Sequence, residues 1–197
     1  MKWDVNITKE GLEIDEYDLP ETVYILARDD KNRVSGVWRM LPSSSPSMIR
    51  DIWPEFLESF PIPINDYSWE VSRFGVHTFC DDPKTHLRQV NKITAELITG
   101  LLTVCNMTGI KDIYTMYNPQ VGRSVRKIGF IADATSQELP VDGKASIVGR
   151  FKMNQEAISR VKGITGIQYD LNPNDLPPIL RERFQKQNST FKEVVHA

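Results

Sequence analysis

One apolar periodicity constrains the fold of this chain more than any other feature. Apolar residues recur at helical spacing between residues 87 and 105, at Leu87, Val90, Ile93, Leu97, Ile98, Leu101, Leu102 and Cys105. Gly109 follows at the position where helices commonly end in a left-handed residue. The flanking segments, 67–77 and 111–117, are rich in aromatic and β-branched residues, which predicts strands. The centre of the chain is therefore expected to be a helix between two strands.

The remaining segments complete an α/β order. Segments 22–29 and 33–41 are predicted strands, and the polar turn between them makes them a hairpin. Segment 42–63 contains five prolines, which predicts a long ordered loop with a short helix at 49–57. Further elements are expected at 119–128 (helix), 144–153 (strand) and 155–162 (helix). This order fits a sandwich of a mixed sheet with helices on its faces.

Composition indicates one soluble folded domain. A chain of 197 residues buries a sizeable core without covalent staples. We expect residues 1–165 to form the α/β domain and residues 166–197, rich in Pro and Asn, to form an irregular C-terminal tail. The net charge of −2 argues against a protein that grips nucleic acid over a broad face.

The cysteines and the start of the chain indicate a cellular compartment. Cys80 and Cys105 have no CxxC spacing and no neighbouring histidine cluster, so neither a metal site nor a disulfide framework is expected. Cys105 is interpreted as a small core residue of the long helix. The start has no apolar signal core, and the chain has no apolar run of about 18 residues. We therefore expect a cytoplasmic protein without a membrane span.

Charged residues inside predicted strands are the first hint of a site. Arg39 lies within segment 33–41, where an arginine most often pairs with a nearby carboxylate. The acidic run at 13–18 is, taken alone, most often a solvated turn. Strict alternation in segment 67–77 places one set of side chains on one face, Trp69, Val71, Arg73 and Gly75, and a second set on the other, Glu70, Ser72, Phe74 and Val76. A buried charge without a partner is expensive, so a structural Glu70–Arg73 ion pair is one interpretation.

Together these groups form a recognisable series of motifs. The D-x-x-D of Asp15 and Asp18 is followed by V-x-R-x-L-P at 37–42 and W-E-x-S-R-F at 69–74. A looser R-x-x-x-K-x-G-F occupies 123–130. In this order the motifs resemble those of the acyl-homoserine-lactone synthases, bacterial enzymes that make autoinducers, over residues 3–162. The resemblance implies an α/β fold, an acetyltransferase-like three-layer sandwich with a mixed central sheet.

The resemblance also implies a reaction. Enzymes of this family transfer an acyl chain from acyl carrier protein to the amine of S-adenosylmethionine (SAM), close the lactone and release methylthioadenosine. SAM is a substrate, so no cofactor is expected. The positions that match the family's near-invariant residues around SAM are Trp3, Asp15, Asp18, Arg39, Glu70 and Arg73.

The chemistry of SAM suggests how these residue types divide the work. Asp15 and Asp18 are expected to hold its cationic groups, and Arg39 or Arg73 its carboxylate. The substrate ammonium must lose a proton before it attacks a thioester, and Glu70 is the predicted base, directly or through water.

Two further features of this chemistry are expected of the backbone and of the substrate itself. Backbone N–H groups of a bulged strand near Ser72 are expected to stabilise the oxyanion. Ring closure is intramolecular and needs little more than correct orientation of the SAM carboxylate.

The acyl tail needs an apolar pocket, and the acyl donor needs a surface. If strand 111–117 splays from strand 67–77, the expected pocket residues are Val71, Ile98, Leu101, Leu102, Thr115 and Tyr117, most of which would equally suit a plain core. Segment 78–88 has no glycine, whereas acetyltransferases that use coenzyme A cradle its pyrophosphate in a Gly-rich loop. The absence of such a loop favours acyl carrier protein over coenzyme A as the acyl donor. Its expected docking patch comprises Lys84, Arg88, Lys92, Lys111, Arg123, Arg126 and Lys127.

Alternatives remain open at this point. The family usually has a longer stretch before the tryptophan that Trp3 matches, including an arginine and a phenylalanine thought to close over SAM. A start assigned too late and a truncated, non-catalytic homologue that binds carrier protein or SAM both fit this difference. Another N-acyltransferase of the same fold is a third interpretation, which the acidic pair and the strand residues Arg39, Glu70 and Arg73 disfavour. The sequence sets neither the acyl-chain length nor the oligomeric state.

Overall fold

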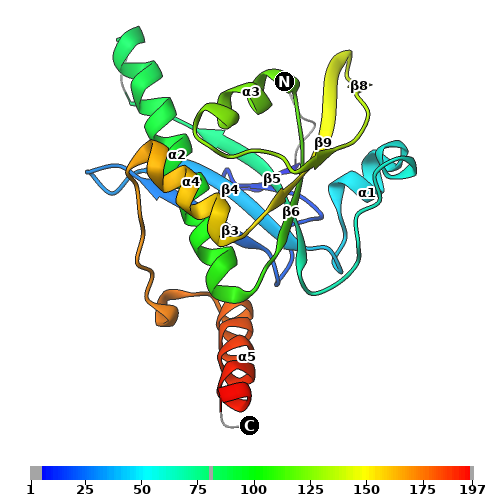
Figure 1. Ribbon diagram of the computed structural model, residues 1–197. Coiled ribbons are helices and arrows are strands. Elements are labelled where there is room, and N and C mark those ends of the chain that lie inside the picture. Colours follow the sequence, from blue (N-terminus) through cyan, green and yellow to red (C-terminus); the bar gives the residue numbers. More distant parts are fainter. Residues whose placement is uncertain (1–5, 80–81, 196–197) are drawn as a thin grey trace.

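The computed structural model describes residues 6–79 and 82–195, which form a mixed sheet flanked by helices (Figure 1). The strands of the main sheet are β3 (Val23–Arg28), β4 (Val34–Pro42), β5 (Ser68–Val76), β6 (Asp112–Tyr117), β7 (Ala134–Thr135), β8 (Leu139–Val141) and β9 (Lys144–Lys152). Their order is β3-β4-β5-β6-β9-β7, and β8 pairs with β9. A separate two-stranded hairpin consists of β1 (Asn6–Ile7) and β2 (Glu13–Ile14).

Helices cover both faces of this sheet. They are α1 (Met48–Ile52), η1 (Pro54–Glu58), α2 (Pro83–Thr108), α3 (Pro119–Lys127), α4 (Gln155–Thr165), η2 (Pro173–Asp175) and α5 (Pro178–Val195). The larger core packs α2, α4 and α5 against one face, with Trp38, Trp69 and Ile113 supplied by the sheet. A smaller core packs α1 and η1 on the opposite side, through Ile49 and Phe56 against Val148. The predicted three-layer α/β sandwich is confirmed.

The long helix lies where the periodicity predicted it. Asp82 caps its start by accepting a hydrogen bond from the backbone N–H of Thr85, and Gly109 ends it at a φ of 70°. Its inner face is buried from Ile93 to Cys105, whereas Leu87 near its start is 61% exposed. The burial of Cys105 raises the pKa of that thiol, so the interpretation of Cys105 as a core residue is confirmed. Cys80 lies outside the described residues.

The strands on either side of α2 diverge toward one edge of the sheet. β5 and β6 are parallel and pair only from Ser68 with Asp112 to Glu70 with Tyr114. Beyond that point β5 continues to Val76 and β6 to Tyr117 without pairing to each other. The predicted splay is therefore present, and it opens the sheet beside the second half of β5.

A bulge in β5 corrects one sequence prediction. Val37 and Arg39 of β4 pair with Gly75 and Ser72, so two steps on β4 oppose three on β5. Arg73 has a φ of 53°, a conformation that costs about 1–2 kcal/mol for a residue with a Cβ. The prediction that Arg73 shares a face with Trp69 and Val71 is wrong, because the bulge turns its side chain toward the face of Ser72.

The C-terminal segment corrects a second prediction. Residues 166–197 were expected to be irregular, but they contain η2 and the 18-residue helix α5, which continues below the end of α2 in Figure 1. Leu176 and Leu180 are buried in the main core, and Phe184 packs against it. The spacing of Leu180 and Phe184 is helical, but the preceding prolines and asparagines obscured it. Along the described residues, no helix combines the length and the apolar character needed to cross a membrane.

Candidate active site

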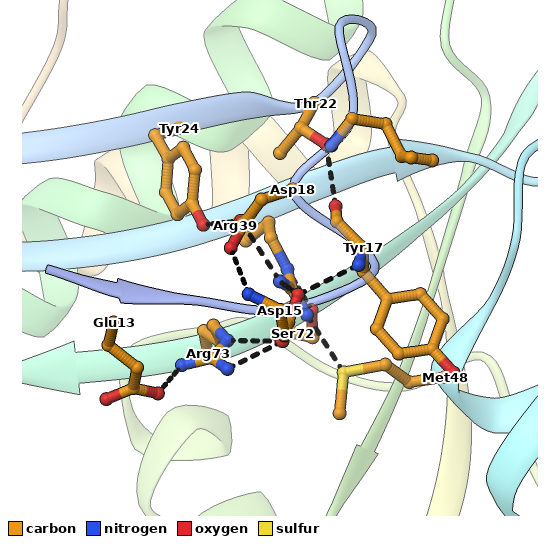
Figure 2. A network of polar contacts seen from close by, with 11 residues as sticks. Glu13, Asp15, Tyr17, Asp18, Thr22, Tyr24, Arg39, Met48, Ser72 and Arg73 are labelled. Carbon is orange, nitrogen blue, oxygen red and sulfur yellow. Dashed lines mark hydrogen bonds and ion pairs between the residues drawn. The ribbon is translucent and has the colours of Figure 1, made fainter. Parts of the chain in front are cut away.

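Arg39 is the most deeply buried charge of the site, with a side chain that is 0% exposed. Its Nη1 lies 2.6 Å from Oδ1 of Asp15 and 3.3 Å from Oδ1 of Asp18. Its Nε donates to Oγ of Ser72 at 3.0 Å. The guanidinium of Arg39 therefore contacts both β5 and the acidic turn of residues 13–18, as Figure 2 shows.

Asp15 bridges the two arginines of the site. Its Oδ1 accepts from Arg39 and from the backbone N–H of Tyr17 at 2.9 Å, and its Oδ2 accepts from Nε and Nη2 of Arg73 at 3.0 and 2.6 Å (Figure 2). Burial raises the pKa of the Asp15 carboxyl, but the hydrogen bonds from Arg39 and Arg73 outweigh this effect and hold its pKa below the ordinary value. Arg73 also pairs with Glu13 of β2.

Asp18 links the acidic turn to strands β3 and β4 of the sheet. Its Oδ2 accepts from the backbone N–H of Asp15 at 2.8 Å, and its Oδ1 accepts from Tyr24 of β3 and from Arg39. Burial opposes ionisation of Asp18, but the hydrogen bond from Tyr24 and the other donors keep its pKa below the ordinary value. The side chains of these two acids and two arginines therefore form one connected network: Asp15, Asp18, Arg39 and Arg73.

Glu70 lies on the same face of the sheet but in different surroundings. It is 3% exposed, and its Oε2 accepts from the hydroxyl of Ser47 and from the backbone N–H of Ile49 at 3.4 Å. Burial raises the pKa of Glu70 above its ordinary value, although these hydrogen bonds oppose the rise. The interpretation of Glu70 and Arg73 as an ion pair is wrong, since Arg73 pairs with Glu13 and Asp15 instead.

A cavity of about 410 Å³ lies beside Glu70, between α1 and the splayed ends of β5 and β6. Glu70, Ser72 and Arg73 form one part of its wall. The rest of the lining is mostly apolar: Met48, Ile49, Trp53, Val71, Phe74, Met116, Tyr117, Asn118, Val121, Val141, Lys144 and Ser146. A buried carboxyl with a raised pKa thus adjoins a chamber suited to an aliphatic chain.

Only two of the residues predicted for the acyl pocket line this cavity. Val71 and Tyr117 line the cavity. Ile98, Leu101 and Leu102, which are at most 1% exposed, belong to the packed core between α2 and the sheet. Thr115 is buried as well and lies outside the lining. The prediction for these four residues is not supported, because α2 already fills the face of the sheet that they were expected to open.

Sequence reasoning missed the part of the wall that comes from remote segments. Met48, Ile49 and Trp53 belong to the proline-rich segment 42–63, which folds back over β5. Val141 and Ser146 come from the β8–β9 hairpin. The apolar residues around α1 were the available signal, but nothing local shows where a loop returns to the sheet.

The basic residues predicted to meet a carrier protein fall into two places. Since β5 and β6 are parallel, α2 and α3 both begin at the edge of the sheet where the strands splay. The exposed members near that edge are Lys84, Arg88 and Lys92 of α2 and Arg123, Arg126 and Lys127 of α3. Lys111 does not belong with them, because it follows the far end of a helix about 39 Å long. Trp3, the remaining predicted SAM-binding residue, lies outside the described residues.

Comparisons with known proteins agree with this site. A family model described as autoinducer synthase matches residues 1–161. An acyl-homoserine-lactone synthase of Acinetobacter nosocomialis is 28% identical over 142 residues, which are 72% of this chain and 77% of the relative.

Two solved structures share the fold. One is a CoA-dependent acyl-homoserine lactone synthase, BjaI, with SAM and isopentyl-CoA; its TM-score is 0.73 at 20% identity, over 90% of this chain and 80% of that one. The other is the synthase LasI, with a TM-score of 0.67 at 23% identity, over 86% and 82%. These likenesses confirm the predicted fold class. With a family match over most of its length, the chain belongs to the autoinducer synthase family.

Proposed function

We propose that this chain joins an acyl chain to SAM, closes the homoserine lactone and releases methylthioadenosine. The observation that carries the proposal most directly is Glu70, a buried carboxyl with a raised pKa in the wall of an apolar cavity, beside Ser72 and Arg73. A base with such a pKa holds an abstracted proton better than an ordinary carboxylate does. The relatives described as acyl-homoserine-lactone synthases support the same reaction.

The two arginines have different tasks in this proposal. Arg39 is 0% exposed and its guanidinium already contacts Asp15, Asp18 and Ser72, which supports a positioning role. Arg73 lines the cavity and its side chain is 28% exposed. We assign the SAM carboxylate to Arg73, which would exchange its outer partner Glu13 for the substrate.

The acyl transfer then proceeds by simple proton movements. Glu70 takes a proton from the substrate ammonium, directly or through water, and the free amine attacks the thioester carbonyl. The β-bulge at Arg73 removes backbone amides from the regular ladder, which supports this stretch as the oxyanion site. When the C–S bond breaks, the proton held by Glu70 passes to the leaving thiolate. The attacking nitrogen loses its second proton to water, which leaves a neutral amide.

Ring closure needs no further base. The SAM carboxylate oxygen attacks the substrate carbon next to sulfur, the C–S bond breaks, and neutral methylthioadenosine leaves with the electron pair. Because nucleophile and leaving group belong to one molecule, the protein contributes mainly orientation. Arg73 must loosen its hold on the carboxylate at this step, which suits its partial exposure more than the full burial of Arg39.

We further propose that acyl carrier protein is the donor and that the reaction takes place in the cytoplasm. BjaI is described as CoA-dependent, so the fold accommodates that donor too and the choice depends on the residues of this chain. At the start of α2, where a pyrophosphate would bind, Asp82 itself caps the helix and Pro83 has no N–H to offer. The exposed basic residues of α2 and α3 suit an acidic protein partner.

The reaction is tested with the purified chain, SAM and a series of acyl carrier proteins of different chain length. Mass spectrometry should detect an acyl-homoserine lactone and methylthioadenosine in equal amounts. An acylated amine without a lactone would instead indicate another N-acyltransferase. Binding of SAM without turnover would indicate a non-catalytic homologue, and either result would overturn the proposal.

The donor is tested by comparing kcat/KM for acyl carrier protein and coenzyme A esters of the same chain. We expect the carrier protein to be preferred, and the substitution Arg123→Glu to weaken only that donor. Lys111→Glu, at the far end of α2, is the matched control and should change neither value. If kcat/KM for the coenzyme A ester equalled or exceeded that for the carrier protein, the capped start of α2 would not exclude coenzyme A as the donor.

A further inference from the structure

Ser47 connects the proline-rich loop to Glu70. It is the last residue before α1, is 3% exposed, and lies 23 positions from Glu70 in the sequence. Its hydroxyl donates a hydrogen bond to Oε2 of Glu70. The same oxygen accepts a hydrogen bond from the backbone N–H of Arg50 at 3.3 Å, so a single hydroxyl serves both contacts.

The contacts to Glu70 are unequally placed on its two oxygens. The hydroxyl of Ser47 and the backbone N–H of Ile49 both donate to Oε2. A carboxylate held through one oxygen by two donors from the same turn keeps its rotamer. The backbone N–H of Met48 also favours the ionised form of Glu70. Neither of the two bonds to Oε2 involves Oε1, so Oε1 is the oxygen on which a proton can be exchanged with a bound molecule.

We propose that Ser47 is a positioning residue for the base: it holds Oε2 of Glu70, so that Oε1 accepts the proton of the substrate ammonium. This inference rests on the proposed function and names a residue that sets the working pH of that reaction. A hydroxyl that donates to the ionised carboxylate favours ionisation and opposes the effect of burial. Loss of the hydroxyl should therefore make Glu70 ionise only at higher pH.

A purely structural role for Ser47 predicts something else. As the N-cap of α1, Ser47 also stabilises the first turn of that helix, and loss of a cap lowers the melting temperature. This loss would not shift the pH at which Glu70 ionises. Asn154 provides a matched control, because its side chain caps α4 by accepting from the backbone N–H of Ala157 at 2.9 Å.

The test measures kcat/KM against pH for Ser47→Ala, Ser47→Gly and Ser47→Thr. Loss of the hydroxyl should move the acidic limb about one pH unit higher, so that on this limb activity falls about tenfold at a given pH. The alkaline plateau should change little. Ser47→Thr keeps the hydroxyl and should restore the wild-type limb, and Asn154→Ala should lower the melting temperature without moving the limb. If Ser47→Ala does not fold, Ser47→Gly, which retains most of the capping, replaces it.

A second measurement separates this inference from the proposed function. Carbon-13 NMR of carboxyl-labelled glutamate reports the ionisation of Glu70 without substrate, assigned with Glu70→Gln. A rise in the pKa of Glu70 on removal of the Ser47 hydroxyl supports the inference even if the chain makes no lactone. An unchanged titration of Glu70 in Ser47→Ala and Ser47→Gly would overturn it even if the wild-type chain is an active synthase.

Discussion

Arg39 and Glu70 lie on neighbouring strands, on the same face of one sheet, and both are almost completely buried. They differ in their partners. The charge of Arg39 is balanced by the carboxylates of Asp15 and Asp18, whereas the hydrogen-bond donors to Glu70 are a neutral hydroxyl and backbone amides. A buried charge with ionic partners stays charged, while a buried acid whose hydrogen-bond donors are neutral takes up a proton at a higher pH than an ordinary carboxylate does. Burial alone therefore does not identify the catalytic group.

The largest effect on stability is expected at Arg39. Arg39→Met leaves Asp15 and Asp18 in place without the guanidinium between them, which should lower the free energy of unfolding by about 3 kcal/mol. Denaturant titration measures this loss. The control is Arg33→Met, which breaks an exposed 2.7 Å pair with Asp29 and should cost less than about 1 kcal/mol. Similar losses in both variants would contradict a structural role for Arg39.

Removal of Arg73 should act on substrate binding more than on stability. Arg73→Met should raise the KM for SAM about 10–100-fold, the value of a charge-assisted pair, with a smaller change in kcat. Arg73→Lys should recover only part of this loss, because an ammonium cannot make the bidentate contact. Steady-state kinetics with varied SAM measures both variants. A KM that stays at the wild-type value would exclude Arg73 as the carboxylate partner.

A smaller effect is expected at the far wall of the cavity. A Cβ on Gly149 would lie 2.7 Å from the hydroxyl of Tyr117, and one on Gly122 would lie 2.6 Å from the same ring. Gly149→Ala should therefore displace the Tyr117 ring, which lines the cavity, and lower kcat/KM for the longest acyl chain used about tenfold relative to shorter ones. Gly163→Ala, where the added methyl meets open space, is the control. An unchanged chain-length profile would show that the acyl chain does not reach Tyr117.

The smallest expected effect is on the pH dependence of stability, to which the Asp15–Asp18 network and Glu70 contribute with opposite signs. The pKa values of Asp15 and Asp18 are lowered in the folded state, so their stabilisation is complete above the ordinary value of 3.8 and is lost as the pH falls through the lower folded values. The pKa of Glu70 is raised, so its protonation in the folded state adds stability as the pH falls toward 4.5. As the pH is lowered, the free energy of unfolding should first rise slightly and then fall, and Glu70→Gln should remove the rise. A monotonic curve in the wild type would contradict the raised pKa.

Much of the fold follows from local pattern. The hairpin of β3 and β4, the helix α2 and its Gly109 end were predictable because each depends on periodicity or on turn residues within a few positions. The four strands β1, β2, β7 and β8 have two or three residues each, too few for any period. The helix α5 was hidden by the prolines and asparagines before it.

The convergence of the charged residues was predictable, but their contacts and most of the apolar cavity wall were not. Asp15, Arg39, Glu70 and Arg73 do converge, as the motif series indicated. The side on which Arg73 lies depends on one extra residue in a strand, which alternation cannot detect. The partner of Glu70, Ser47, comes from a loop whose path is determined by tertiary packing rather than by local sequence.

The measurement that tests the account most directly is the pH dependence of kcat for Glu70→Gln, taken together with its melting temperature. The amide keeps the shape of the side chain but cannot accept a proton, so kcat should fall about 10²–10⁴-fold at neutral pH. Higher pH should recover part of the activity, because more substrate amine is then already deprotonated, and the melting temperature should not fall, because no buried ion pair is broken. Wild-type kcat with a lowered melting temperature would contradict the account and make Glu70 a structural residue.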